Sequence, residues 1–145
     1  MTDKDELLVW ARGCFASDRY ATEATGITIE ELDVDDATHG GWARCRLCLK
    51  LRHRNARGAV MGGVFFTLAD FAAAIAMNVA ESAGSNELHW VSLSGTVNFM
   101  AQPRGEELTA VARCIRQGRG TCLYETHITE QDRILACVTT TGMRV

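Results

Sequence analysis

One long apolar run that contains a single acid limits the folds open to this chain. Almost every residue from Val64 to Met77 is apolar, yet Asp70 lies in the middle of the run. Most of these residues, the alanines above all, are strong helix formers. The run predicts a helix from about Gly63 to Ser82, and a helix that is apolar nearly all round should be buried.

The rest of the chain is dominated by segments in which apolar and polar residues alternate, as they do in half-buried strands. The expected strands span Thr25–Val34, Trp42–Leu51, Trp90–Met100, Glu107–Gln117, Thr121–Glu130 and Ile134–Met143. Two short connections, 118–120 and 131–133, separate the last three strands and predict an antiparallel meander of hairpins. A capping pattern at Thr2 or Asp3 predicts a short N-terminal helix over about residues 2–14.

The order of these elements predicts the fold class. Two strands, one long buried helix and four antiparallel strands fit an α+β fold, in which an antiparallel sheet wraps around a single central helix beside a short N-terminal helix. A chain of 145 residues is long enough for one sizeable core and leaves little room for a second. We therefore expect one domain over residues 1–145.

Charge and composition argue against several kinds of partner. The net charge of −3 offers no electrostatic basis for nucleic-acid binding. The N-terminus is acidic and lacks the basic-then-apolar pattern of a signal peptide. The apolar run around Asp70 is too short and too charged to be expected to span a bilayer. We expect a cytoplasmic protein with neither nucleic acid nor a membrane as its partner.

Six cysteines raise the question of a metal site. Cys45 and Cys48 form a C-x-x-C pattern, but no second pair or histidine follows at the spacing of zinc ligands. They also fall in an expected strand, where side chains three residues apart point to opposite faces. We therefore expect no metal site, and reduced thiols that are mostly buried.

Asp70 needs an explanation, because an ionised carboxylate alone in a dry core is very costly. It must have hydrogen-bond partners, hold a proton or face a cleft. Two interpretations remain open from the residues alone. Asp70 is either a structural group bonded to nearby hydroxyls, amides or water, or a general base or nucleophile activated by a partly apolar pocket.

Two glycines, Gly62 and Gly63, stand where the expected helix begins. A helix N-terminus presents unpaired N–H groups and a partial positive charge. Without a side chain there, a ligand oxygen can approach the backbone closely, so the site could hold the carbonyl oxygen of an acyl substrate as it becomes an oxyanion. The alternative is a tight turn that needs glycine for backbone reasons.

The spacing of these groups constrains how they could act together. Asp70 lies seven residues beyond Gly63, which is about two turns and roughly 10 Å along a helix axis. One acyl carbon cannot touch both groups of the same helix. A second, antiparallel copy of the helix would bring the glycine of one chain to the aspartate of the other, so the pattern predicts a homodimer with two shared sites.

The residues around the apolar run resemble a known family. The segment from Asn55 to Asp70 follows the pattern N-x-x-G-x-x-[H]-G-G-x-x-F-x-L-A-D, with Met61 at the bracketed position, and resembles the PaaI-like thioesterases of the hotdog-fold superfamily. The stretches VSLSGTVNFMAQP, RCIRQGRGTCLYETHI and ILACVTTTGM resemble later strands of that family. The resemblance covers roughly residues 27–143.

The resemblance implies hydrolysis of an acyl-CoA thioester. Asp70 of one subunit would activate water or attack the carbonyl, and the backbone N–H of Gly62 in the partner subunit would polarise the thioester C=O. Asn55 would lie near the same carbonyl or nucleophile. The family also implies that coenzyme A arrives as part of the substrate with no further cofactor or metal, and that the homodimers can pair into tetramers.

Other positions match substrate-binding regions of the family, each with an ordinary alternative. Gly63 lies beside Gly62 at the helix start. Ser92 matches a water-orienting hydroxyl, or is a simple strand serine. Thr67 lies one turn before Asp70 and could reach its carboxylate, or could cap the preceding backbone carbonyl. Arg119 and Thr121 match a hairpin that contacts the coenzyme A arm, or form an exposed turn.

Met61 is the main departure from the family, which usually carries histidine there. Methionine neither donates a strong hydrogen bond nor carries charge. Methionine at this position leaves three outcomes open: slower hydrolysis, a changed substrate, or binding of an acyl-CoA or lipid without cleavage. A further alternative on the same fold is an enoyl-CoA hydratase or dehydratase, which needs an acid–base pair, commonly with a histidine. No histidine lies near Asp70 in the sequence.

Overall fold

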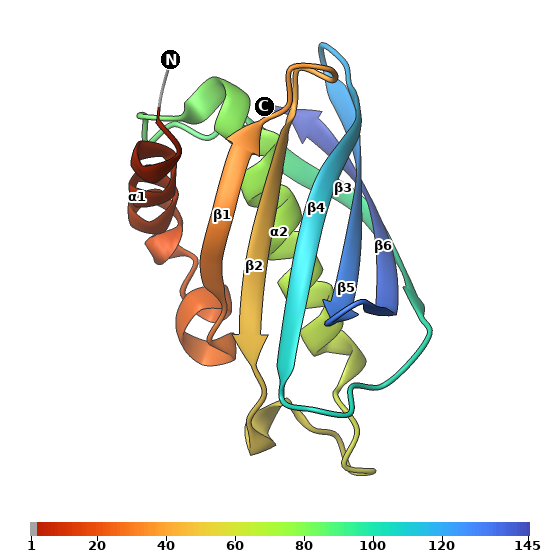
Figure 1. Ribbon diagram of the computed structural model, residues 1–145. Coiled ribbons are helices and arrows are strands. Elements are labelled where there is room, and N and C mark those ends of the chain that lie inside the picture. Colours follow the sequence, from red (N-terminus) through yellow and green to blue (C-terminus); the bar gives the residue numbers. More distant parts are fainter. Residues whose placement is uncertain (1–2) are drawn as a thin grey trace.

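The computed structural model describes residues 3–145 (Figure 1). The main elements in chain order are α1 (Lys4–Cys14), β1 (Thr28–Val34), β2 (Gly41–Cys48), α2 (Gly62–Ser82), β3 (Trp90–Phe99), β4 (Glu107–Gln117), β5 (Thr121–Glu130) and β6 (Arg133–Arg144). Short helical turns join some of them: η1 (Phe15–Ser17), η2 (Tyr20–Thr25) and η3 (Leu51–His53).

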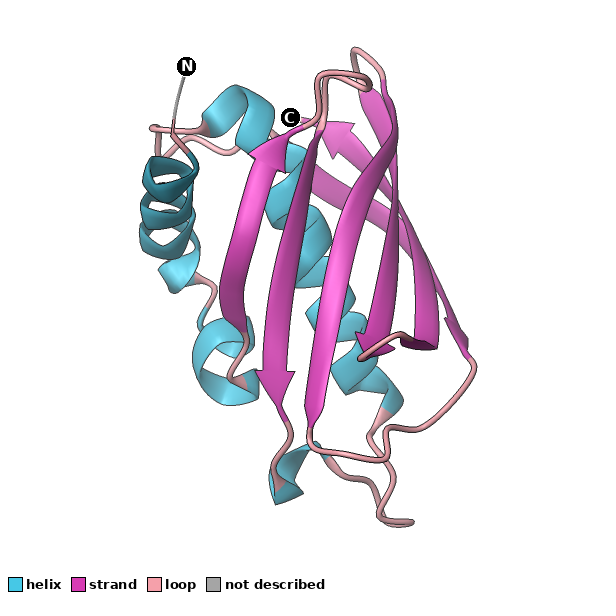
Figure 2. Cartoon of the chain, viewed as in Figure 1, coloured by secondary structure: helices cyan, strands magenta, loops and turns pink. Residues whose placement is uncertain are grey.

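The six strands form one antiparallel sheet in the order β1-β2-β4-β5-β6-β3. The sheet curves around α2, which lies along its concave side, and α1 lies beside the β1 edge (Figures 1 and 2). The predicted α+β architecture is therefore confirmed, as is the meander of β4, β5 and β6. The strand that precedes the meander, β3, crosses to the far edge and pairs with β6.

The central helix is buried because the sheet wraps most of its circumference. Twelve of its residues are buried, and its apolar side chains form the core together with the inward residues of the strands. By length and composition alone α2 could cross a membrane, since its apolar window has a mean hydropathy of 1.6. The expectation that no segment is long and apolar enough is therefore wrong on those criteria. However, 61% of that window is buried inside the protein, as in a core helix.

A buried amide fixes the position of β3 against α2. Asn78 is 1% exposed, and its Oδ1 accepts hydrogen bonds of 3.0 Å from the backbone N–H groups of His89 and Trp90. Its Nδ2 donates to the carbonyl oxygens of Ala74 and Trp90, at 2.9 and 3.0 Å. The start of β3 is thus bonded directly to the central helix, which places this edge strand beside the helix face that carries Asp70.

The structure shifts several expected element boundaries. The segment 20–25 forms a π-helical turn that ends at Gly26, whose φ of 90° is left-handed, so β1 begins at Thr28 rather than Thr25. β2 ends at Cys48, because the ring of His53 accepts the N–H of Lys50 at 2.8 Å and closes a helical turn there.

The other boundaries agree to within one residue, apart from the N-terminal helix. That helix begins at Lys4, with Asp3 at its N-cap position but without a side-chain capping bond. Thr2, the other expected cap, lies outside the described residues.

The cysteines follow the strand geometry. Cys45 is buried and Cys48 exposed, which confirms that they point to opposite faces of β2. All six thiols are free, but only Cys45, Cys114 and Cys122 are buried, so the expectation of mostly buried thiols is met for half of them. Within residues 3–145 no cluster of three His, Cys, Asp or Glu side chains could hold a metal ion.

Candidate active site

The start of α2 is prepared by the loop that precedes it. Asn55 is bound within this loop, where its Oδ1 accepts hydrogen bonds from the N–H groups of Arg57 (2.9 Å) and Ala59 (3.2 Å). Met61 occupies the N-cap position with extended backbone angles, φ −62° and ψ 137°, and its side chain is 56% exposed. Within one chain, Asn55 therefore shapes the approach to the helix rather than contacting Asp70.

The two glycines at the helix start have different surroundings. Gly62 is the first residue of α2, so its N–H has no acceptor within the helix. A Cβ added at Gly62 would lie 3.0 Å from Cζ of Phe99, whereas one added at Gly63 would meet nothing within 4 Å. A Cβ at position 62 would therefore require a small shift of the Phe99 ring, and the structure gives no steric reason for a glycine at 63.

Asp70 is half-buried and faces β3. Its Oδ1 accepts a hydrogen bond of 2.8 Å from Oγ of Ser92 on that strand. The structure thus brings together Asp70 and Ser92, which the family resemblance placed in one site. Asp70 is neither sealed in the core nor a bare surface group, since it has one hydroxyl partner and also lines a pocket.

That pocket has a volume of about 200 Å³ and lies between α2 and the segment that follows α1. Its lining combines aromatic, small and acidic residues: Asp18, Tyr20, Ala21, Phe66, Thr67, Asp70, Phe71 and Ala74. Thr67 lines this pocket, but its hydroxyl donates to the carbonyl of Gly63 at 2.8 Å rather than to Asp70. Of the two interpretations of Thr67, the structure favours the backbone cap.

Asp18 and Tyr20 are pocket residues that sequence reasoning missed. They lie about fifty residues before Asp70 in a stretch with no motif, so only the folding of this segment over α2 brings them together. Burial, and secondarily the negative charge of Asp70, raise the pKa of the Asp18 carboxyl. The negative charge of Asp70 therefore acts on the Asp18 carboxyl across the same small pocket.

Arg119 and Thr121 lie far from the helix start within one chain. They belong to the β4–β5 hairpin, where the N–H of Gly118 donates to the carbonyl of Thr121 at 2.9 Å. This hairpin stands at the end of the sheet where α2 finishes, whereas Gly62 stands at the opposite end (Figure 1). A single chain therefore does not bring these two residues to Gly62.

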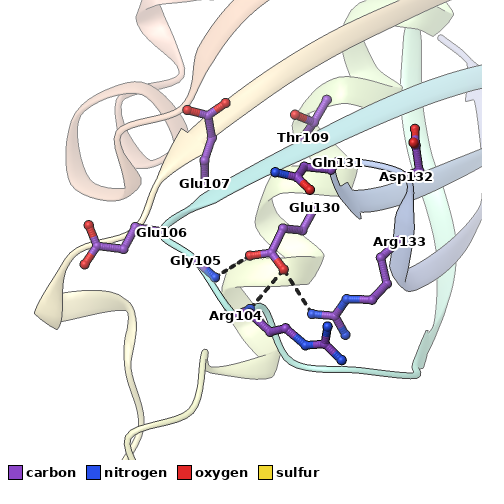
Figure 3. Close-up of a pocket in the computed structure, with 9 residues that line it drawn as sticks. All are labelled: Arg104, Gly105, Glu106, Glu107, Thr109, Glu130, Gln131, Asp132 and Arg133. Atoms are coloured by element: carbon purple, nitrogen blue, oxygen red, sulfur yellow. Dashed lines mark hydrogen bonds and ion pairs between the residues drawn. The ribbon is translucent and has the colours of Figure 1, made fainter.

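A wider hollow, about 910 Å³, lies elsewhere, between the β3–β4 connection and the β5–β6 hairpin (Figure 3). Its central group is Glu130, which accepts the backbone N–H groups of Arg104 (2.9 Å) and Gly105 (2.5 Å) and pairs with Arg133 at 3.0 Å. These contacts lower the pKa of Glu130 to about 2. Because its carboxylate is fully engaged in holding the loop, we assign this hollow a structural role.

The edge strand beside Asp70 has one free edge and is largely exposed. Within residues 3–145, β3 pairs only with β6, and nearly all of its residues after Trp90 are exposed. Several are large and apolar, among them Val91 (44% exposed), Leu93 (58%) and Phe99 (55%). An unpaired, apolar strand edge is a ready site for pairing with another chain.

Comparisons with known proteins agree with this geometry. The family model of the thioesterase superfamily matches residues 57–137. No curated protein sequence matches the chain significantly.

Among solved structures, the PaaI protein of the phenylacetic acid degradation operon of Escherichia coli is 24% identical, with a TM-score of 0.76 and 96% of each chain covered. A mutant thioesterase from Pseudomonas aeruginosa is 20% identical, with a TM-score of 0.75 and 93% of each chain covered.

A third solved structure is a hypothetical thioesterase from Streptococcus pneumoniae in complex with coenzyme A. It is 21% identical, with a TM-score of 0.71, and the match covers 90% of this chain and 96% of that one. At such identities these structures confirm the fold, and the family model, which covers more than half of the chain, confirms the family. This protein thus belongs to the thioesterase superfamily and is a thioester hydrolase with the hotdog fold.

Proposed function

We propose that this protein hydrolyses acyl-CoA thioesters in active sites that are shared between two copies of the chain. The observation that carries the proposal is Asp70, a carboxylate on an otherwise apolar helix that faces a pocket and is oriented by Ser92. The Ser92 hydroxyl donates a hydrogen bond to Oδ1 of Asp70, and within the described chain no group is hydrogen-bonded to Oδ2. That second oxygen is available to take a proton from water or to attack a carbonyl carbon.

The carbonyl oxygen needs a hydrogen-bond donor, which we assign to the N–H of Gly62. In one helix, Gly62 and Asp70 are eight residues apart, or about 12 Å along the axis. A thioester carbonyl cannot contact both at once, so the donor and the carboxylate of one site come from different subunits. Two-fold symmetry then gives two equivalent sites per dimer.

The open edge of β3 supports this assembly. Pairing of two β3 strands about a two-fold axis is antiparallel, and it would cover the apolar residues that the single chain leaves exposed. Ser92 lies on this strand, so the same contact that joins the subunits would lie next to Asp70. We propose a homodimer as the minimal active unit, with a tetramer as a further assembly.

Coenzyme A as the carrier of the acyl group is supported by the Streptococcus pneumoniae relative, whose structure contains it. Phe66, Phe71 and Ala74 give the pocket beside Asp70 an apolar wall, which suits the acyl part of such a substrate. Arg119 and Thr121 would contact the coenzyme A arm when the partner subunit brings its hairpin near. We propose that no separate cofactor or metal takes part.

Met61 supports one second candidate, an acyl-CoA-binding protein that does not cleave. Its side chain is 56% exposed at the helix start, where a thioether cannot supply the hydrogen bond that an imidazole would. A hydratase or dehydratase is less well supported, because no histidine lines the pocket of Asp70. His53 is buried, and its ring nitrogens lie within hydrogen-bond distance of Lys50 N and Thr25 O.

The direct test is thiol release from a panel of acyl-CoA thioesters, with Asp70→Asn as the matched variant. We expect the wild type to release coenzyme A and Asp70→Asn to lose about 10²- to 10⁴-fold in kcat, as for a lost general base. Equal, near-zero rates for both proteins together with retained acyl-CoA binding would support the binding-only candidate. Loss of conjugation in an enoyl-CoA substrate would support the hydratase.

A further inference from the structure

We propose that Gln102 is a positioning residue of this active site, and that its side-chain amide sets the direction in which the Gly62 N–H points. The inference rests on the proposed function, in which that N–H binds the thioester carbonyl. Gln102 does not touch the substrate in this scheme. It acts through the backbone of Val60, two residues before Gly62.

The contact between Gln102 and Val60 has two points. Oε1 of Gln102 accepts the N–H of Val60 at 2.8 Å, and Nε2 donates to the carbonyl of Val60 at 3.3 Å. Val60 is 2% exposed, so these backbone groups have little access to water. Gln102 lies in the β3–β4 connection, and its side-chain amide therefore pairs with the backbone of Val60 as a neighbouring strand would.

No other part of the loop before α2 satisfies these two groups of Val60. Residues 53–55 form an antiparallel bridge with 59–61, in which Met61 N donates to His53 O (2.9 Å) and Asn55 N donates to Ala59 O (2.8 Å). In such a bridge the intervening residue, Val60, directs its own N–H and C=O to the opposite side. Gln102 lies on that side and completes the pairing.

This arrangement leaves little freedom between Gln102 and the catalytic N–H. The peptide plane between Val60 and Met61 is held at its carbonyl by Gln102 and at its N–H by His53. Only φ and ψ of Met61 separate that plane from the N–H of Gly62. The direction of the proposed oxyanion donor thus depends on how firmly the Val60 peptide is held.

Gln102 is itself held firmly. Its backbone carbonyl accepts a hydrogen bond of 2.8 Å from Arg133, which also pairs with Glu130 at 3.0 Å. Glu130 in turn binds the backbone N–H groups of Arg104 and Gly105, just after Gln102 in the chain (Figure 3). The β5–β6 hairpin therefore fixes the loop that carries Gln102. In this way the contacts of Glu130 and Arg133 that line the 910 Å³ hollow also support the start of α2.

An oxyanion donor is effective only if it is aimed before the reaction begins. Loss of a whole donor costs about 10²- to 10³-fold in kcat. We expect Gln102→Leu, which keeps a branched side chain of similar bulk but neither hydrogen bond, to lower kcat about tenfold or more while KM changes less. Gln102→Glu keeps an acceptor for Val60 N and should fall between Leu and the wild type.

Gln117→Leu is the matched control for general loss of stability. Gln117 also accepts a side-chain hydrogen bond, from the Tyr124 hydroxyl at 3.0 Å. It is the last residue of β4, beside the β4–β5 hairpin, at the end of the sheet opposite the start of α2. This variant should lose stability without a comparable loss of kcat. An equal drop in kcat for Gln117→Leu and Gln102→Leu would overturn the positioning role, because it would show that kcat follows stability alone.

The decisive measurement is the infrared band of a ¹³C-labelled thioester carbonyl in an acyl-CoA bound to Asp70→Asn, where the substrate persists. We expect the band at a lower frequency than in free acyl-CoA, and largely returned to the free value when Gln102→Leu is added. An unchanged shift in the double variant would overturn the role of Gln102 and leave the proposed function standing. Absence of a shift in Asp70→Asn itself would overturn both.

Discussion

Oγ of Ser92 lies 2.8 Å from Oδ1 of Asp70, and this hydrogen bond links the edge strand β3 to the central helix at the carboxylate that we propose as the general base or nucleophile. A hydroxyl in that position fixes the rotation of the carboxylate, so that Oδ2 keeps one direction. The bond also joins the site to the strand through which we propose that two subunits pair. In the proposed dimer, assembly and orientation of the Asp70 carboxylate would therefore be coupled through one side chain.

Removal of this hydroxyl tests the orienting role of Ser92. We predict that Ser92→Ala lowers kcat about tenfold, less than Asp70→Asn, because the general base remains but is no longer held. Ser94→Ala is the matched control, since Ser94 lies on the same exposed strand and makes no side-chain hydrogen bond in the described chain. Steady-state hydrolysis of one acyl-CoA by both variants is the measurement, and equal rates would contradict the role of Ser92.

Asp18 predicts an unusual dependence of stability on pH. Its pKa is raised in the folded state above the ordinary value of 3.8 by burial and by the charge of Asp70. A raised pKa means that the folded state favours the protonated form, so the contribution of Asp18 to stability is present below pH 3.8 and is lost as pH rises through the folded pKa. At neutral pH the ionised carboxylate is destabilising.

We therefore predict that Asp18→Asn raises the Tm at pH 7 and that this gain shrinks as the pH approaches 3. Thermal unfolding monitored by circular dichroism at several pH values checks the prediction. Asp36→Asn, on the exposed β1–β2 turn, serves as the control for simple loss of one negative charge. A gain of the same size for both variants at every pH would refute the explanation.

The lowered pKa of Glu130 predicts the opposite dependence of stability on pH. Its pKa falls from 4.5 to about 2, chiefly because the N–H groups of Arg104 and Gly105 bind the ionised form. A lowered pKa means that its stabilising contribution is present above pH 4.5 and is lost as pH falls from there toward 2. Glu130→Gln should therefore lower the Tm at pH 7 and approach the wild type near pH 2.

Glu106→Gln is the matched control for Glu130, because it removes an exposed charge from the same loop. Chemical unfolding at pH 7 and at low pH compares the two variants with the wild type. A deficit of Glu130→Gln that persists unchanged to pH 2 would show that the charge of this carboxylate is not what holds the loop.

The sequence predicts most of the fold because its signals are local. Helical composition and alternation located α2 and the strands to within a few residues, and the glycine-containing connection 118–120 predicted the β4–β5 hairpin. The π-helical turn over 20–25 was missed, since no pattern was found in residues 20–24 and Thr25 was assigned to the partly alternating strand that follows. The position of β3 at the far edge is a long-range pairing that no local pattern encodes.

The candidate site was predictable where its residues share one segment. The glycine pair and Asp70 are in one helix, so a motif could show them together. Asp18 comes from a turn without a motif, and Gln102 from the end of a stretch whose family resemblance gave this residue no role. Only the folded chain brings Asp18 beside Asp70 and Gln102 beside Val60. Residues that act by holding the backbone are especially hard to predict, because ordinary loop glutamines look the same in sequence.

In the proposed dimer, each active site takes Asp70 from one subunit and the Gly62 N–H from the other. Gly62→Pro removes that N–H alone, and proline is tolerated at the first position of a helix. The extended backbone of Met61, with ψ of 137°, is also compatible with a following proline. The Cβ of the proline would lie 3.0 Å from Cζ of Phe99, so the exposed end of this ring must shift by a few tenths of an ångström to accept it.

The most direct measurement is the activity of a heterodimer with Asp70→Asn in one subunit and Gly62→Pro in the other, purified through two different tags. Both homodimeric variants should be nearly inactive. With shared sites, one of the two sites in the heterodimer has both groups intact, so it should recover about half of the wild-type activity. A heterodimer as inactive as the two homodimers would contradict the account, because each chain would then supply both groups of its own site.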